Sequence, residues 1–125
     1  MVSIDKVKSY TDLLVWQKSI ELVKEVYLIT KSFPKEEVYG LTSQIRRATV
    51  SISSNIAEGF MRQYKPEIIQ FLYISLGSCG ELHTQLVIAK ELKFITEYQL
   101  DNLTTKHLFF ISRMLQNLIK SLRNK

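Results

Sequence analysis

The chain has 125 residues, of which 46% are hydrophobic and 23% charged, a composition typical of one globular domain spanning residues 1–125. Its formal net charge is +5, and no apolar run approaches the roughly 20 residues that cross a bilayer, so we expect no membrane contact. Cys79 is the single cysteine and residues 1–9 lack the apolar core of a secretion signal, which excludes an internal disulfide and favours the cytoplasm.

The first helix is predicted over residues 12–32. Thr11 or Asp12 is expected to cap its start, and Phe33-Pro34 to stop it, because the residue before proline avoids the helical conformation. Apolar residues form two stripes: Leu13, Trp16, Ile20, Val23 and Tyr27, and Val15, Leu22, Val26, Ile29 and Phe33. Together they are wider than one bundle core requires, which indicates burial against a neighbouring subunit.

The second helix, predicted over residues 40–59, has two seams with steps of three and four. The apolar seam is Leu41, Ile45, Ala48, Ile52 and Ile56, and the polar seam is Gln44, Arg47, Ser51, Asn55 and Glu58. Such a polar row indicates an interface between helices or subunits rather than a catalytic site. Arg47 is a candidate to pair with Glu58 or with Glu81 of a neighbouring helix, and Gly59 is expected at the helix C-cap.

The third helix is predicted over residues 66–92, with Pro66 in the first turn, where its missing N–H costs nothing. Its main seam is Ile69, Leu72, Leu76, Cys79, either Leu82 or His83, Leu86 and Ala89. Gly77 and Gly80 lie mid-helix, where each costs about 0.8–1 kcal/mol relative to Ala. We interpret them as a place where another backbone approaches closely.

The last helix is predicted over residues 97–123, with Thr96 at its N-cap. Its core seam is Leu100, Leu103, Ile111, Leu115, Leu118 and Leu122. Phe109 and Phe110 cannot both lie on this seam, so one is expected to cover a flank or face a partner. No segment alternates with period two, and the predicted fold is therefore all-α, an antiparallel up-down-up-down four-helix bundle.

The residue constellations that catalysis requires are missing from the sequence. There is no Glu-x-x-His pair, no zinc-ligand spacing, no phosphate-binding glycine loop and no nucleophile elbow. We therefore expect no enzyme activity, no metal and no cofactor. Cys79 and Trp16 are interpreted as core residues, and His83 as a hydrogen bonder at the edge of the core or an interface.

Cations are the candidates for function. The residues expected to contact nucleic acid are Arg46, Arg47, Arg62, Lys65, Lys120 and Arg123. Arg46, Arg62 and Lys65 could form one basic patch near the second and third helices, or be part of an ordinary solvated surface. The chain has no acidic residue after Asp101, which fits either nucleic-acid contact or cations stabilising the C-terminal end of a helix.

Several strings together resemble a known family. They are D-L-x-V-W-Q-K at residues 12–18, S-Q-I-R-R-A at 43–48, S-I-S-S-N-I-A-E-G-F at 51–60 and E-L-x-T-Q-L-x-I-A-K-E-L at 81–92. From Tyr10 to Leu122 the chain is similar to the four-helix-bundle proteins encoded in intervening sequences of bacterial large-subunit ribosomal RNA genes. The accessory variability determinant of diversity-generating retroelements is a relative of that family. The glycine that follows E-G-F in the family is Met61 here, whereas Arg62 is retained.

The resemblance implies a ring-like homopentamer, association with RNA or DNA through a basic surface, and no catalysis. Two functions stay open: a non-enzymatic homo-oligomeric scaffold that binds nucleic acid weakly through several copies of a basic surface, and a protein-binding adaptor without nucleic-acid contact. The partner of such an adaptor could be a reverse transcriptase, as for the retroelement relative, and would dock near Phe109 or Phe110. An enzyme with an unrecognised site is the third alternative, for which the sequence offers no carboxylate cluster.

Overall fold

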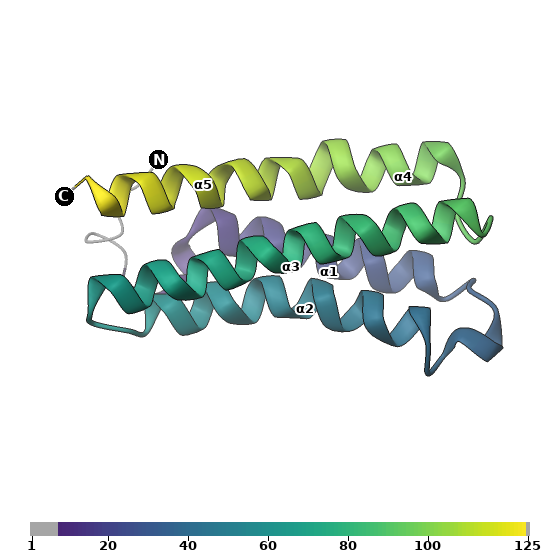
Figure 1. Cartoon of the computed structure of the whole chain (residues 1–125), viewed down its shortest axis with the longest axis horizontal. Helices are drawn as coiled ribbons and strands as arrows, with labels where there is room; N and C mark the ends of the chain where they lie inside the picture. Colours follow the sequence, from purple (N-terminus) through teal and green to yellow (C-terminus); the bar gives the residue numbers. More distant parts are fainter. Residues whose placement is uncertain (1–7, 125) are drawn as a thin grey trace.

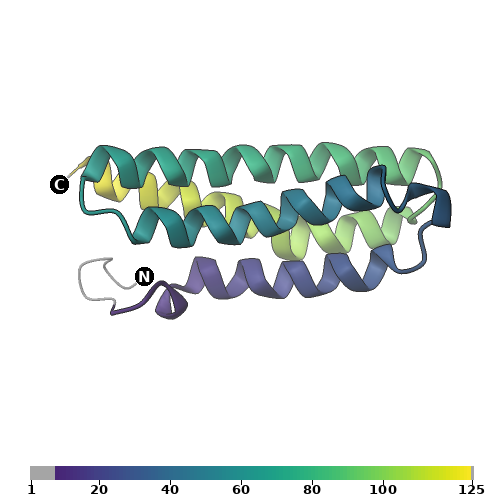
Figure 2. The same ribbon diagram turned by 90° about the horizontal axis from the view of Figure 1, so that it is seen from below.

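The structure is a computed structural model that describes residues 8–124. Residues 1–7 and Lys125 lie outside the described residues. The prediction that residues 1–9 are not a secretion signal therefore falls mostly outside them. Figure 1 shows long helical rods packed side by side, and Figure 2 shows the same bundle from below. Within residues 8–124 no helix is both long and apolar enough to span a membrane.

The helices follow the predicted order. A 3₁₀ turn at Tyr10–Asp12 leads to α1 (Leu14–Thr30), and a second 3₁₀ turn at Lys35–Glu37 precedes α2 (Leu41–Phe60). After α3 (Lys65–Glu91), the last rod consists of α4 (Glu97–Leu103), a π-helical turn (Thr104–Leu108) and α5 (Phe109–Arg123). The part of the chain that the structure describes contains helices and no strand, which confirms the all-α four-helix bundle (Figure 1).

The core is built from the predicted seams. Four residues of the apolar seam of α2 are buried, and Leu41 packs half-buried at its edge. On α3, Leu82 takes the core position and is fully buried. His83 lies at the edge of the core, where its ring contacts Phe109 of α5. All six predicted seam residues of the last rod are buried, and Leu108 and Ile119 join them.

The predicted start of the first helix was wrong. Thr11 and Asp12 lie in the 3₁₀ turn, whose N-cap is Ser9, with its hydroxyl accepting from the Thr11 N–H at 3.2 Å. The N-cap of α1 is Leu13, which supplies no side-chain hydrogen bond. The polar residues therefore cap a separate turn, and α1 begins two residues later than predicted and ends at Thr30.

The two apolar stripes of α1 have different environments. In the second stripe, Val15, Leu22, Val26 and Phe33 are buried and Ile29 is partly buried. In the first stripe only Leu13 is buried, because Trp16, Ile20 and Val23 are half-buried and Tyr27 is exposed. The protomer core thus covers one stripe and leaves much of the other at the surface.

The glycines do not have their predicted roles. Gly59 lies inside α2 rather than at its C-cap, which is Met61. A Cβ on Gly59 would lie 3.0 Å from the Phe71 Cβ and 3.3 Å from the Ile68 carbonyl oxygen, so Gly59 allows α2 and α3 to approach. By contrast, a Cβ on Gly77 or Gly80 would meet nothing within 4 Å. The predicted close approach at these two is therefore not made inside the protomer.

The last rod begins with the predicted Thr96 cap, in which the Thr96 hydroxyl accepts from the Gln99 N–H at 3.1 Å and the Gln99 side chain accepts from the Thr96 N–H.

The π-helical turn in the last rod was not predicted. It keeps both Leu103 and Leu108 in the core although they are five residues apart, whereas residues on one face of an α-helix are three or four apart. Both Phe109 and Phe110 then fall outside the core, with exposed fractions of 45% and 40%.

Candidate nucleic-acid interface

The middle of the polar seam of α2 contacts α3. The hydroxyl oxygens of Ser51 and Ser78 lie 2.9 Å apart, and the Asn55 amide donates to the Ser51 carbonyl at 2.8 Å and to its hydroxyl at 3.0 Å. The Ser51–Ser78 contact joins α2 to α3 without a bulky side chain between them, whereas the two Asn55 bonds lie within α2 and hold Ser51 from its own helix. This part of the seam therefore serves an interhelix interface inside the protomer.

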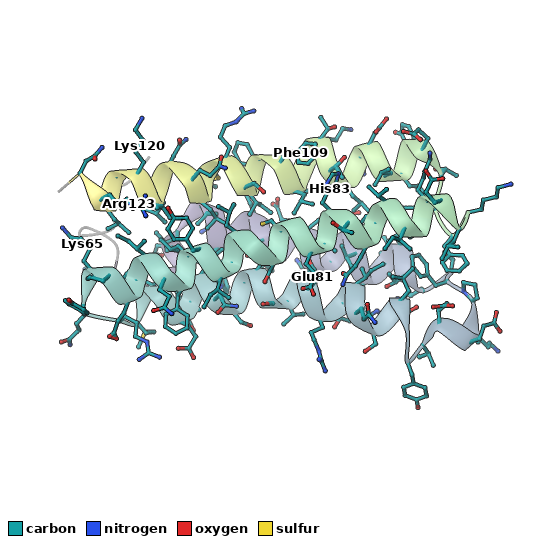
Figure 3. The ribbon with its side chains drawn as sticks, in the orientation of Figure 1. Lys65, Glu81, His83, Phe109, Lys120 and Arg123 are labelled. Carbon is teal, nitrogen blue, oxygen red and sulfur yellow. The ribbon has the colours of Figure 1, made fainter. Side chains whose placement is uncertain are left out.

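The ends of the polar seam face solvent. Gln44 and Arg47 are exposed and make no side-chain hydrogen bond or ion pair with any described residue. The predicted pairing of Arg47 with Glu58 or Glu81 is therefore not made. Glu58 instead lies 3.4 Å from Arg62, one helical turn further along. Figure 3 shows Glu81 on the side of α3 that borders α2, where its carboxylate is exposed.

A set of buried serine contacts was not predicted from the sequence. The hydroxyls of Ser19 on α1 and Ser53 on α2 lie 2.8 Å apart, and Ser75 on α3 donates to the Ile52 carbonyl at 2.8 Å. All three serines are buried. Their positions next to the apolar seams were visible in the sequence, but a serine beside a seam is as often solvent-exposed, so spacing alone does not identify such contacts.

The six predicted cations fall into two groups. The Arg46 cluster consists of Lys31, Lys35, Arg46 and Arg47 at the ends of α1 and α2 that lie together. The terminal cluster is defined by one end of the bundle: it consists of Lys65, Lys120 and Arg123, and of Arg62 in the link between α2 and α3 at that end. Lys31 and Lys35 were not predicted. The suggested single patch of Arg46, Arg62 and Lys65 is not formed, because Arg46 packs on α1 and Arg62 on α3. Along a helix their 16-residue separation is about 24 Å.

Arg46 has a fixed side chain. Its guanidinium carbon lies 4.5 Å from the centre of the Tyr27 ring, and its Nε donates to the Thr30 hydroxyl at 2.9 Å. The Thr30 hydroxyl in turn donates to the Val26 carbonyl at 2.8 Å. These contacts hold the plane of the guanidinium and leave most of its Nη hydrogens for another acceptor.

The terminal cluster lies where α3 begins and α5 ends. Figure 3 shows Lys65, Lys120 and Arg123 at this end of the bundle. The Arg123 guanidinium lies 5.2 Å from the centre of the Tyr73 ring, and the two residues line an open cavity of about 420 Å³ together with Lys120. Arg62 lies 4.8 Å from the centre of the Phe71 ring. Three of the predicted arginines therefore rest on aromatic rings, a geometry that orients a guanidinium without neutralising it.

The remaining candidate residues have structural environments. Cys79 is buried, which confirms its interpretation as a core residue, and burial raises the pKa of its thiol to about 11. Trp16 packs against the core, with its ring 5.7 Å from that of Tyr10. His83 contacts the Phe109 ring edge-on, with centroids 5.3 Å apart. Among residues 8–124, no three His, Cys, Asp or Glu side chains gather in a way that could hold a metal ion.

Comparisons with known proteins give one family. The model of the family described as 23S rRNA-intervening sequence protein matches residues 11–117. A crystal structure of a protein with unknown function, from the S23 ribosomal protein family of Bacteroides thetaiotaomicron VPI-5482, is 27% identical to the chain. The two structures match with a TM-score of 0.76, and the match covers 86% of this chain and 99% of the other chain. No curated protein matches the chain, and neither description names a catalytic activity.

Proposed function

Because the chain belongs to the 23S rRNA-intervening sequence protein family, we propose that it is a non-enzymatic, homo-oligomeric scaffold of the cytoplasm that binds nucleic acid weakly through its basic clusters. The Arg46 cluster and the terminal cluster are the contact surfaces. Several copies of each would bind one nucleic-acid molecule together, since linked weak contacts raise the overall affinity without any new contact.

The observation that carries this proposal is the stacking of Arg46, Arg62 and Arg123 on aromatic rings. A contact with a ring does not occupy the N–H donors of a guanidinium. Arg46 donates from Nε to Thr30 and from one Nη to the Tyr27 carbonyl at 3.5 Å, which leaves its other Nη hydrogens available. A planar guanidinium with free N–H edges is well suited to a backbone phosphate. Arg62 also pairs with Glu58, so we expect Arg46 and Arg123 to contribute more.

The oligomer is supported by surface that the protomer does not use. The first apolar stripe of α1 is only partly covered, and Gly77 and Gly80 on α3 have open space where a side chain would be. Each glycine costs about 0.8–1 kcal/mol of helix stability relative to Ala, and a close approach by a second copy would offset that cost. Five copies per assembly is the number that the family resemblance implies, and we propose it on that ground.

A titration against structured RNA and duplex DNA at two salt concentrations tests nucleic-acid binding. The test variant is Lys120→Glu with Arg123→Glu, and the control is Lys24→Glu with Lys106→Glu, which makes the same charge change at exposed positions outside both clusters. We expect affinity to fall steeply as salt rises, with a slope of about −0.9 per phosphate contacted on duplex DNA. The test variant should bind at least about tenfold more weakly than the control.

Equal losses in the two variants would mean that net charge alone attracts nucleic acid, and the proposed surface would then be wrong. Absence of binding at low salt would exclude the proposal altogether and favour the adaptor. The specific observation that favours the adaptor is the exposure of the neighbouring Phe109 and Phe110 rings on α5. Apolar docking there would be insensitive to salt and lost on Phe110→Ser.

A further inference from the structure

Two open cavities lie against the Arg46 side chain. One, of about 370 Å³, lies beside the turn that follows α1, and the other, of about 390 Å³, lies against Tyr27 and Val50. Arg46 and Thr42 line both. Their lining residues come from α1, α2 and the link between them, and Figure 2 shows these two helices side by side. A single guanidinium is therefore accessible from two sides while its plane is fixed by Tyr27 and Thr30.

Thr42 lines both cavities with a hydroxyl that makes no hydrogen bond in the described part of the chain. The residue as a whole is only 6% exposed. Buried threonines in helices ordinarily donate to a carbonyl of the preceding turn. Thr30 and Thr104 do so in this chain, at 2.8 and 2.9 Å. Among residues 8–124, the fully buried side-chain atoms without a partner belong to Thr49 and Gln85. The Thr42 hydroxyl is instead accessible from the two cavities that it lines, where it is available to donate to an acceptor on a ligand.

The charge around the two cavities is of one sign. Their lining includes Lys31, Lys35, Arg46 and Arg47 and no carboxylate. The nearby Glu37 carboxylate accepts from the Leu41 N–H at 3.1 Å, so it is engaged at the start of α2. A ligand that fits must therefore be an anion with several acceptor oxygens, and it must be small enough for cavities of this size.

We propose that the cavities around Arg46 bind a phosphate group. The free Nη hydrogens of Arg46 would donate to two phosphate oxygens, the Thr42 hydroxyl to a third, and the lysines would supply further positive charge. The phosphate is either free inorganic phosphate or part of a nucleic-acid backbone. For a backbone phosphate this inference rests on the proposed function, since the Arg46 cluster is one of its two contact surfaces, whereas binding of free phosphate is tested separately from it.

The test is an NMR titration of the full chain with inorganic phosphate, against chloride at equal ionic strength. We expect phosphate to shift the amide signals of Thr30, Thr42 and Arg46. Arg46→Gln should raise the Kd for phosphate by about tenfold or more, as loss of charge-assisted hydrogen bonds predicts. Thr42→Val, which keeps the shape of the side chain, should raise it severalfold. Arg113→Gln makes the same charge change as Arg46→Gln at an exposed position on α5 and should leave it within about twofold.

The inference is overturned if phosphate has no effect beyond that of chloride, or if Arg46→Gln and Arg113→Gln weaken binding equally. Should Arg46→Gln fail to fold, an unchanged Kd in Thr42→Val overturns it. A single-stranded oligonucleotide then identifies the source: it shifts the same amides if the ligand is a backbone phosphate and leaves them unshifted if it is free phosphate. Phosphate binding without any oligonucleotide binding would support this site and contradict the proposed function.

Discussion

Cys79 shows how the packing of one residue sets its chemistry. Burial in the core raises the pKa of the thiol from 9.0 to about 11, against the opposing effect of a hydrogen bond with Ser112. The thiolate is the reactive form, so a thiol that stays protonated at neutral pH is a poor nucleophile. The position of Cys79 on an apolar seam made its burial predictable, whereas Ser112, on another helix, could not be assigned to it from the sequence.

The raised pKa of Cys79 predicts a pH-dependent loss of stability. The unfolded chain releases the thiol proton near pH 9 and the folded chain near pH 11, so the free energy of unfolding should fall between these values. The fall should be at most about 1.4 kcal/mol per pH unit. Denaturant unfolding of the wild type and of Cys79→Ala from pH 8 to 11 measures it. Parallel curves for the two proteins would contradict the prediction.

Gly59 and Gly77 predict opposite effects of the same substitution. Gly59→Ala should destabilise the chain by about 1–3 kcal/mol, because its Cβ would be 3.0 Å from the Phe71 Cβ. In the separate protomer, Gly77→Ala should stabilise the chain by about 0.5–1 kcal/mol, because open space surrounds that position there and alanine favours the helix. Denaturant midpoints at matched protein concentration decide both. If Gly77→Ala is destabilised only at protein concentrations where the chain assembles, a second copy packs against α3, as the proposed oligomer requires; destabilisation at every concentration would contradict the prediction.

At the scale of the helices, regular seams were the predictable part. Steps of three and four fixed α2, α3 and the buried seam of the last rod, because one face of a helix must meet the core. Helix starts were less predictable, since Ser9, Thr11 and Asp12 are all good capping residues and only the tertiary structure selects among them. The paired cavities could not be predicted either, because they depend on Arg46 turning toward α1 rather than toward α3.

The start of α4 depends on the reciprocal bonds between Thr96 and Gln99. Thr96→Ala removes the hydroxyl that accepts from the Gln99 N–H and should destabilise the chain by about 1 kcal/mol. Thr96→Ser keeps that acceptor and serves as the control, with a smaller effect. Thermal unfolding compares the variants. Equal losses for alanine and serine would show that the cap is not what stabilises this end.

At the scale of the whole molecule, the fold was predicted because each rod carries its own periodic signal and the links are short. The assembly was not fixed in this way. Two apolar stripes on the first helix predicted more burial than one core provides, and the structure leaves Ile20 and Val23 half-buried. The sequence of one helix cannot say whether such a stripe meets another helix of the same chain or of a second copy.

The mass in solution checks the assembly. Light scattering should return a multiple of the 14.6 kDa of one chain, with five copies expected from the family resemblance. Ile20→Lys places a charge on the uncovered stripe and should lower the mass, because burying a lysine in an apolar interface is costly. Leu14→Lys, on another face of α1 and already 48% exposed, is the control. A wild type with the mass of a single chain would contradict the prediction.

The π-helical turn makes the last rod tolerant of a particular length change. Each residue of an α-helix rotates the direction of the side chains by a fixed angle. The π-helical turn at Thr104–Leu108 holds one extra residue without changing which face of the following helix meets the core. Deleting the exposed Lys106 should therefore leave Leu103 and Leu108 four apart and keep both halves of the rod in register with the core. Deleting Arg113, which is also exposed, should rotate everything after it by about 100° and displace Leu115 and Leu118. If thermal unfolding followed by circular dichroism shows equal destabilisation by the two deletions, the π-helical turn does not tolerate the loss of a residue and the prediction is wrong. If only the second is damaging, relatives that are one residue shorter at this turn can share the fold without any compensating change.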